Sequence, residues 1–420
     1  MLDNAEKKER FILAGVHTGR ADKINDTTDE SLDELDELVK TAGGEVIGTL
    51  IQNKSDLESA TYMGEGKLME LAELVAAMEA DAVVFDDELS PVQLRNITDD
   101  LGCKVIDRSM LILDIFAMRA KSGEGKLQVE LAQLKYRLPR LRGAGLEMSR
   151  TGGGIGTRGP GETQLETDRR HIRRRISSLE DEIAEMKKHR SLIRGRRKKD
   201  GVITAAIVGY TNAGKSTLLN ALTGAGILAE DKLFATLDPT SRAITLDDNR
   251  RILLVDTVGF IRKLPHHLID AFKSTLEEAV VADFLIHVID AADAEMENQI
   301  SVVNSVLRDI GATGKRTVTV YNKIDKLTDH NRAMSLGGGN SVLISAKTGL
   351  HMDKLMRAIS ETAPGRKQKV KVMIPYSEGA LVNELHENQK VISEEYAAGG
   401  TVMELMVDNE MYERIRLYCL

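Results

Sequence analysis

One stretch of the sequence has the residue types and spacing needed to hold a phosphorylated ligand. It follows an aliphatic run at 204–208, precedes a helical pattern that continues to Leu222, and reads Gly209-Tyr210-Thr211-Asn212-Ala213-Gly214-Lys215-Ser216-Thr217. Glycines let backbone N–H groups turn toward an anion, and the start of the helix adds the positive end of its dipole. In a G-x-x-x-x-G-K-S loop the lysine reaches the β- and γ-phosphates and the serine hydroxyl binds Mg²⁺. The stretch predicts a triphosphate site; the alternative is a plain glycine turn.

A second motif supplies a carboxylate and a glycine after another strand. The aliphatic run 252–255 ends in Asp256-Thr257-Val258-Gly259, a D-x-x-G. The Asp256 carboxylate can hold Mg²⁺ through a water molecule, because hard cations take oxygen ligands. The backbone N–H of Gly259 can donate to the γ-phosphate. By itself a D-x-x-G is weak evidence, and its value lies in following the phosphate loop.

A third motif indicates which base is bound. The aliphatic run 317–320 ends in Asn322-Lys323-Ile324-Asp325, and Ser345-Ala346-Lys347 follows a later strand at 342–344. The Asp325 carboxylate can accept hydrogen bonds from both N1–H and N2–H₂ of guanine, a pair of donors that adenine lacks. A site built around such donors rejects the analogue without them. We therefore predict GTP as the substrate, with 345–347 closing over the guanine.

The segment between the first two motifs is the candidate nucleotide switch. It reads Phe234-Ala235-Thr236-Leu237-Asp238-Pro239-Thr240 and has no strong periodicity. In switch loops of this kind a threonine completes the Mg²⁺ shell only when the γ-phosphate is present. Thr236 is the candidate, although Thr240 or Ser241 can play the same role and an ordinary polar loop is the alternative. The predicted catalytic residues are Lys215, Thr236 and Gly259, and the predicted metal ligands are Ser216 and Thr236.

Four motifs occur in chain order, each at the carboxyl end of a strand: the phosphate loop, D-x-x-G, 322–325 and 345–347. Together they resemble the translation-factor class of P-loop GTPases. That resemblance implies an open α/β sheet over residues 201–362, with its ligand loops along one edge. Many such proteins place a glutamine after D-x-x-G to orient the attacking water, whereas this sequence has Phe260. A phenyl ring cannot orient water. We expect slow hydrolysis that a partner stimulates.

The composition of the chain indicates what class of protein carries this site. The chain has 420 residues, 42% of them hydrophobic, which allows several packed domains. No apolar stretch approaches the roughly 18 residues of a membrane span, and residues 1–20 lack a secretory signal pattern. Cys103 and Cys419 have no metal-site spacing. These features predict a cytoplasmic protein with no disulfide framework or zinc site, and peripheral membrane association stays open.

Residues 1–120 alternate between strand-like and helix-like patterns, which predicts a small parallel sheet covered by helices. The short run Gly64-Glu65-Gly66-Lys67 resembles a phosphate loop but lacks its spacing, so we interpret it as a helix-entry turn. The expected strands are 11–16, 45–52, 82–86 and 104–106, and the expected helices are 31–42, 66–78 and 91–101.

Residues 121–200 carry two apolar seams with helical spacing. The first is Leu127, Leu131, Leu134, Leu138 and Leu141; the second is Leu165, Ile172, Ile176, Leu179, Ile183, Met186 and Ile193. Two seams with a break between them predict an antiparallel helical hairpin. Its second arm of roughly 30 residues would be about 45 Å long. The competing interpretation is a parallel homodimeric coiled coil; we favour the hairpin and a protein that is monomeric when free.

The tip of this hairpin, residues 143–161, has eight glycines among nineteen residues. Such a loop is either a flexible connector or a segment that becomes ordered against a surface requiring close backbone approach. Charge favours the second interpretation: residues 135–200 hold 19 Lys and Arg against 9 Asp and Glu, in a chain of formal net charge −8. A basic region on an acidic protein is typical of binding to a nucleic-acid backbone, although a solvated helix face is the alternative. The predicted RNA-docking residues are Arg150, Gly152, Gly153, Gly154 and Arg158.

The runs 137–143, 149–162 and 168–170, followed by the nucleotide motifs, resemble the HflX family of ribosome-associated GTPases. The resemblance covers nearly the whole chain and is most specific in the tip loop. It implies a factor that binds the large ribosomal subunit, reaches ribosomal RNA near the peptidyl-transferase region with that loop, and splits stalled ribosomes, notably after heat stress. Phe260 agrees with the family. ATP hydrolysis and RNA unwinding are also ascribed to it, but residues 1–130 contain no ATP-binding motif.

The remaining residues, 363–420, predict a small α+β appendage. A Pro-Gly linker precedes an alternating strand at 369–375, a helix at 379–388 and strand-like runs at 391–396 and 401–407. Nothing in its composition indicates a role. The predicted organisation is thus a multidomain α/β protein: residues 1–120, the hairpin at 121–200, the GTPase domain at 201–362 and the appendage at 363–420.

Overall fold

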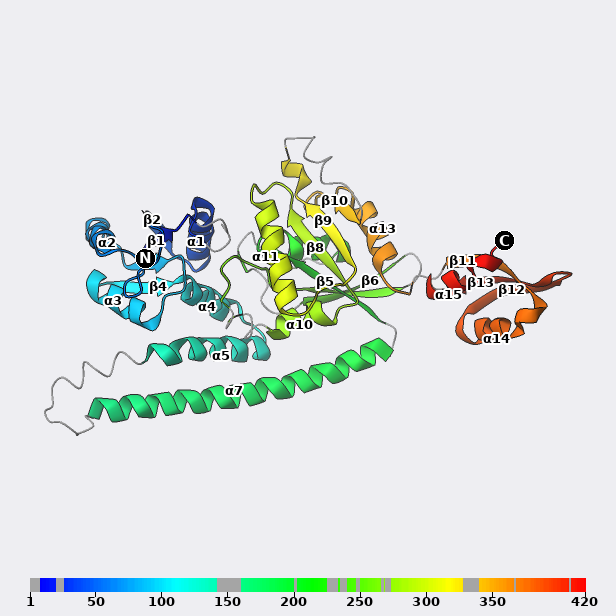
Figure 1. Ribbon diagram of the computed structural model, residues 1–420, viewed down its shortest axis with the longest axis horizontal. Helices are drawn as coiled ribbons and strands as arrows, with labels where there is room; N and C mark the ends of the chain where they lie inside the picture. The colour runs from blue at the N-terminus through cyan, green and yellow to red at the C-terminus, as the bar shows by residue number, and fades with distance from the viewer. Residues whose placement is uncertain are drawn as a thin grey trace, which may run out of the picture.

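The computed structural model describes residues 8–19, 26–141, 160–199, 202–224, 233–234, 240–246, 250–265, 268, 273–327, 340–365, 368–407 and 409–420. At 160–165, 196–199, 273–275, 368 and 409–410 the structure describes the backbone alone. The predicted multidomain α/β organisation is confirmed, with two mainly parallel sheets, a long helical hairpin and a small third sheet (Figure 1).

The amino-terminal sheet has the order β2-β1-β3-β4, and all of its strands are parallel. The seven predicted elements are confirmed, and local chemistry explains their ends: a Ser90–Gln93 capping box and Pro91 start α3. Gly64 caps the start of α2, as the helix-entry interpretation predicts. A further helix, α4, was not predicted. The elements are β1 (Arg10–His17), α1 (Asp29–Thr41), β2 (Glu45–Asn53), α2 (Glu65–Met78), β3 (Ala82–Phe85), α3 (Pro91–Leu101), β4 (Lys104–Asp107) and α4 (Arg108–Arg119).

The second sheet has the order β10-β9-β8-β5-β7-β6, and only β6 runs antiparallel to its neighbour. The central strands are buried on both faces, which explains their continuous aliphatic sequences. The elements are β5 (Ile203–Gly209), α8 (Lys215–Thr223), β6 (Thr240–Thr245), β7 (Arg251–Asp256), α10 (Lys273–Val281), β8 (Phe284–Asp290), α11 (Met296–Asp309), β9 (Thr317–Asn322), β10 (Ser341–Leu343) and α13 (Met352–Thr362).

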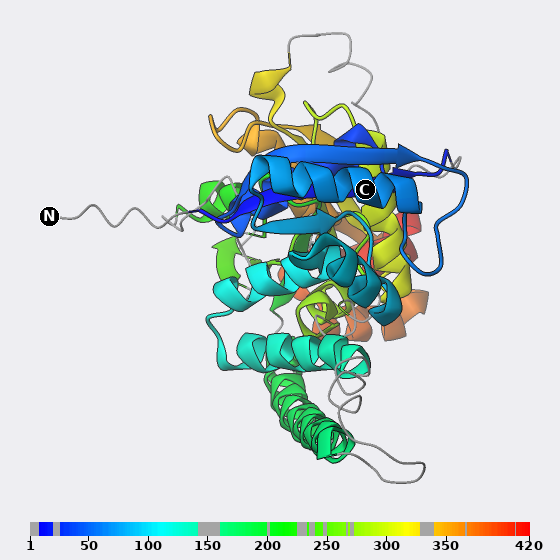
Figure 2. The same cartoon turned by 90° about the vertical axis from the view of Figure 1, so that its left-hand side faces the viewer.

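Helices α5 (Gly123–Arg140) and α7 (Pro160–Lys199) form the predicted antiparallel hairpin. Both views place the two arms together along the lower side of the molecule (Figures 1 and 2). The predicted length of the second arm is wrong: α7 has 40 residues, hence about 60 Å. Polar and basic residues at both ends of α7 interrupt the apolar spacing, so that spacing predicted too short a helix. Ile172, Ile176 and Ile183 are partly buried and Leu179 is fully buried, whereas Met186 and Ile193 are exposed.

Ion pairs fasten the base of α7 to helix α10 of the nucleotide domain. Lys187 pairs with Glu277, and Arg194 pairs with both Glu277 and Glu278. Arg190 pairs with Glu124 at the start of α5, 2.7 Å away. Helix α10 comes shortly after the D-x-x-G motif in the chain. We call these contacts between α7 and α10 the hairpin clamp.

The carboxyl-terminal unit is an antiparallel sheet of order β11-β13-β12 with helices packed on one face. The predicted strands and helix are confirmed, and α15 is an addition. The carboxyl-terminal unit lies at the end of the molecule opposite the distal part of the hairpin (Figure 1). Its elements are β11 (Gln368–Ile374), α14 (Gly379–Asn388), β12 (Lys390–Ala397), β13 (Gly400–Val407) and α15 (Asn409–Ile415). Within the described ranges, no helix is both long and apolar enough to cross a membrane.

Candidate nucleotide site

The phosphate loop leaves β5 at the carboxyl edge of the larger sheet, and two of its glycines are required by close contacts. Gly209 has φ of 155°, and a Cβ there would lie 2.2 Å from the carbonyl oxygen of Val288. Gly214 has φ of 94°, and a Cβ there would lie 2.3 Å from Nδ2 of Asn322. Any side chain would therefore collide with β8 or with the base-reading motif.

Lys215 starts helix α8 and is only 7% exposed. Its Nζ donates to the carbonyl oxygen of Tyr210, 2.7 Å away. Burial lowers the pKa of Lys215 to about 8; Asp256 opposes this effect and Lys323 adds to it. A desolvated ammonium in a glycine-rich cradle is the arrangement that an anionic phosphate would stabilise.

The structure brings the first two motifs into direct contact. Oγ of Ser216 donates to Oδ2 of Asp256 over 2.8 Å. A hydroxyl and a carboxylate side by side are a donor set that suits Mg²⁺, which prefers oxygen ligands. These two residues would hold the ion, directly through Ser216 and through water at Asp256, and the ion would neutralise charge on the phosphates. The other candidate ligand, Thr236, lies outside the described residues, as do Ala235, Leu237 and Asp238.

The base-reading motif is tied to the phosphate loop through Asn322. Its Nδ2 donates to the carbonyl oxygen of Ala213 at 2.9 Å, and its Oδ1 accepts from the N–H of Ala346 at 2.9 Å. One buried amide therefore joins three of the predicted motifs. Asp325 is exposed on a short 3₁₀ turn, Ile324–Lys326, where its carboxylate is accessible to a base.

Asp290 is a site residue that the sequence reasoning missed. It is the last residue of β8, and its carboxylate lies 2.8 Å from Nζ of Lys323. Its place at the end of an aliphatic strand was a usable signal, because the carboxyl ends of parallel strands meet at one sheet edge. The pair fixes the lysine of the base-reading motif.

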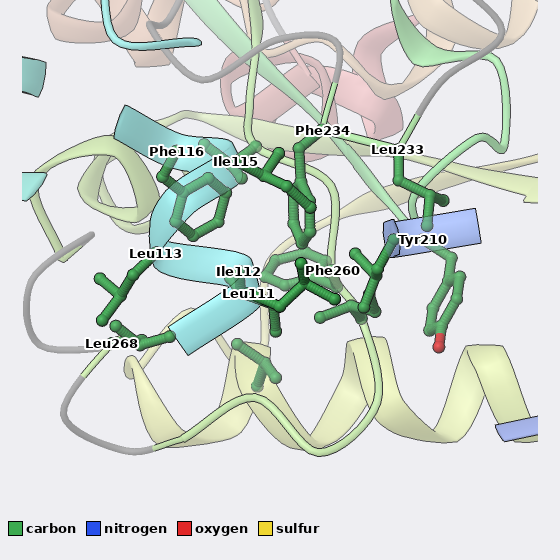
Figure 3. Close-up of a cluster of buried hydrophobic side chains, with 14 of the residues drawn as sticks. Leu111, Ile112, Leu113, Ile115, Phe116, Tyr210, Leu233, Phe234, Phe260 and Leu268 are labelled. Atoms are coloured by element: carbon green, nitrogen blue, oxygen red, sulfur yellow. The ribbon is translucent and has the colours of Figure 1, made fainter. Parts of the chain in front are cut away.

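Phe260 is packed against helix α4 of the amino-terminal region. Its side chain is 1% exposed within a cluster that includes Leu111, Ile112 and Phe234 (Figure 3). The rings of Phe116 and Phe234 meet edge to face at 4.6 Å. Phe234 opens the candidate switch segment and Phe260 follows D-x-x-G. Helix α4 therefore contacts both of the segments expected to respond to the nucleotide.

A buried polar network also connects the amino-terminal region to the nucleotide domain. Arg108 of α4 pairs with Asp86, 2.7 Å away, and with Glu34, 2.6 Å away, and Lys263 also pairs with Asp86. Burial alone would raise the pKa of Asp86, but the charges of Arg108 and Lys263 hold it well below its usual range. The hydroxyl of Tyr210 donates to Glu34 and accepts from the N–H of Arg262. No sequence pattern indicated these long-range contacts.

His287 on β8 provides a pH test of this sheet. Burial, with Lys215 second, lowers the pKa of His287 to about 4. The folded state then binds fewer protons than the unfolded state. The contribution of His287 to the free energy of unfolding is therefore complete above pH 6.5 and decreases as the pH falls. By pH 4 the free energy of unfolding should be lower by about 3 kcal/mol. Denaturant titrations from pH 7 to pH 4 should show this component in the parent and not in His287→Gln. An equal acid response in both proteins would contradict it.

Comparison with known proteins decides the family. Residues 29–117, 119–197 and 204–323 match the families described as GTP-binding GTPase N-terminal, GTP-binding GTPase Middle Region and 50S ribosome-binding GTPase. The chain is 51% identical to GTPase HflX of Caldanaerobacter subterraneus subsp. tengcongensis, over 100% of this chain and 96% of that one. This chain belongs to the HflX family of GTPases. It is 43% identical to GTPase HflX of Escherichia coli, over 96% of this chain and 94% of that protein.

A solved structure is also similar: a GTP-binding protein from Sulfolobus solfataricus in complex with GDP, 28% identical, with a TM-score of 0.43, covering 84% of this chain and 98% of that one. As a GTPase of the HflX family, the chain hydrolyses GTP to GDP and phosphate. The structure gathers Lys215, Ser216, Asp256 and Asn322 at one sheet edge. The predicted RNA-docking residues, Arg150 to Arg158, lie outside the described residues.

Proposed function

We propose that the protein is a Mg²⁺-dependent GTPase whose nucleotide state controls its binding to the large ribosomal subunit, and that it splits stalled ribosomes in the cytoplasm. The observation that carries the proposal is the match of residues 204–323 to a ribosome-binding GTPase family in a chain that also has a long basic hairpin. GTP binding would favour docking, and hydrolysis would release the factor.

The distribution of charge along α7 supports an RNA-facing role for its distal half. Three basic residues near its base, Lys187, Arg190 and Arg194, are engaged in the hairpin clamp or with Glu124. Arg170, Arg173 and Arg174 are exposed nearer the tip, at i, i+3 and i+4 spacing, which places them on one face of the helix. An exposed group of arginines beside a glycine-rich loop suits a phosphate backbone.

Cosedimentation with separated ribosomal subunits tests the proposal. The protein should pellet with the large subunit in the presence of a non-hydrolysable GTP analogue and stay in the supernatant with GDP. Equal binding in both states, or preference for the small subunit, would contradict it. A rival function, a binding protein in which hydrolysis is incidental, is favoured by Phe260, which cannot orient water. Multiple-turnover kinetics separate the two, because only the proposed GTPase cycle requires stimulation by ribosomes.

The tip loop gives a second test. Replacing Gly152-Gly153-Gly154 by three alanines should block close approach to RNA, because each alanine adds a Cβ and disfavours positive φ. Changing Arg150 and Arg158 to alanine should flatten the salt dependence of binding by up to about one unit of log–log slope per lost phosphate contact. Binding measured over a salt series checks both variants.

The matched control is Arg416→Ala, which removes an exposed arginine from the carboxyl-terminal unit. It should leave ribosome binding unchanged. All three variants should keep their intrinsic GTPase rate. If the tip variants bind and split ribosomes like the parent, the loop is only a connector.

A further inference from the structure

Thr211, the third residue of the phosphate loop, carries a buried hydroxyl without a visible structural purpose. The residue is 6% exposed, and within the described part of the chain its Oγ1 has no hydrogen-bond partner. Leaving such a group unsatisfied costs about 1–3 kcal/mol, and buried polar atoms in native proteins are rarely left so. A buried hydroxyl that the described residues leave unbonded can serve a bound ligand or a water molecule.

The position of Thr211 places it beside the point where the first two motifs converge. A Cβ built on Gly259 would lie 2.9 Å from Cα of Thr211, 2.9 Å from its Cγ2, and 2.9 Å from Nζ of Lys215. The N–H of Thr211 donates to the carbonyl oxygen of Phe260 at 2.7 Å. If Lys215 and Gly259 hold the γ-phosphate, the side chain of Thr211 lies at the border of that group.

Hydrolysis needs a group that this sequence lacks in the usual place. The attacking water must be oriented toward the γ-phosphorus, and many related GTPases use a glutamine after D-x-x-G. Here Phe260 is apolar and its ring is enclosed by α4. A hydroxyl can do part of that work, because it accepts a hydrogen bond from water while donating to a phosphate oxygen.

We propose that the hydroxyl of Thr211 positions the attacking water against the γ-phosphate of GTP. The oxygen of that water forms the new bond to the γ-phosphorus. The bond from phosphorus to the β–γ bridging oxygen breaks, and its electron pair stays on GDP. A proton from the water passes to an oxygen of the departing phosphate. Thr211 gains and loses no proton, so its contribution is orientation.

The inference rests on the proposed placement of the γ-phosphate, and a pair of variants of the full chain tests it. Thr211→Val keeps the shape and removes the hydroxyl; Thr211→Ser keeps the hydroxyl. The valine variant should lose about 100-fold in kcat, in the range seen when one transition-state hydrogen bond is removed. The serine variant should stay within about threefold of the parent. Both should bind GDP and a non-hydrolysable GTP analogue with unchanged Kd.

Binding of GDP with aluminium fluoride, which mimics the transition state, should weaken only in the valine variant. A valine variant with parental kcat overturns the inference. So does a parallel loss of kcat and analogue affinity in both variants, which would mean that the side chain only supports the loop. Failure of the parent to bind a GTP analogue, or to cosediment with ribosomal subunits, would instead count against the proposed function, so the two failures are distinguishable.

Discussion

The Asp325→Asn variant should bind GTP about 10- to 100-fold more weakly than the parent, because its amide oxygen can still accept one hydrogen bond from guanine, whereas the other bond, to a charged acceptor and worth roughly 1.5–3 kcal/mol, is lost. Xanthosine triphosphate should become the preferred nucleotide. The asparagine amide can donate to the carbonyl at position 2 of xanthine, where a carboxylate can only accept. Competition between GTP and xanthosine triphosphate, followed by binding or by turnover, measures the change directly.

The same substitution elsewhere controls for charge. Asp353 is an exposed aspartate in the first turn of α13, and Asp353→Asn should leave the nucleotide preference as it was. Because Asp325 is exposed, its substitution should not disturb folding, so a loss of GTP affinity would not come from a folding defect. An unchanged preference for GTP in Asp325→Asn would show that this residue does not read the base.

Lys215→Ala and Ser216→Ala should separate phosphate binding from metal-dependent turnover. Without its ammonium, the loop should lose triphosphate affinity more than diphosphate affinity, since the lysine reaches the β- and γ-phosphates. Without its hydroxyl, Ser216→Ala should lose roughly 10²–10³-fold in turnover together with its response to Mg²⁺, in line with removal of one electrostatic contact to a transferring group. Titrations of Mg²⁺ at fixed GTP measure the second effect.

Ser177→Ala, at an exposed position on α7, is the matched control and should keep parental turnover. Because Oγ of Ser216 also donates to Asp256, thermal unfolding of the variant should be recorded alongside the kinetics. Normal hydrolysis by Ser216→Ala with ribosomes present would mean that the metal is held elsewhere.

Sequence reasoning succeeded where a residue acts through its neighbours in the chain. The phosphate loop had to connect a strand to a helix, and β5 and α8 flank it at those positions. The four nucleotide motifs follow parallel strands, so their meeting at one sheet edge was a geometric necessity. Aliphatic runs predicted the buried strands for the same reason, since a strand covered on both faces has no polar side.

Contacts between distant segments were not predictable in this way. Helix α4 is apolar on several faces because it packs on its own sheet, on α5 and on Phe234 and Phe260 at once, and no simple period describes such a helix. The pairing of Lys263 with Asp86 joins positions 177 residues apart. Either residue alone is an ordinary surface charge in the sequence. Only the folded arrangement shows that the residue replacing glutamine is held by another domain.

The position of the hairpin clamp would allow α7 to act as a lever. The contacts of Lys187 and Arg194 lie near one end of α7, and residues 160–187 extend beyond them for about 40 Å at 1.5 Å per residue. Helix α10, which receives the clamp, follows the D-x-x-G motif in the chain, and segments at that motif are ordered by the γ-phosphate in GTPases. A rotation of about 10° at that pivot would carry the far end of α7 through about 7 Å. A small rearrangement around a phosphate would then be amplified into a displacement of several ångströms at the far end of the hairpin.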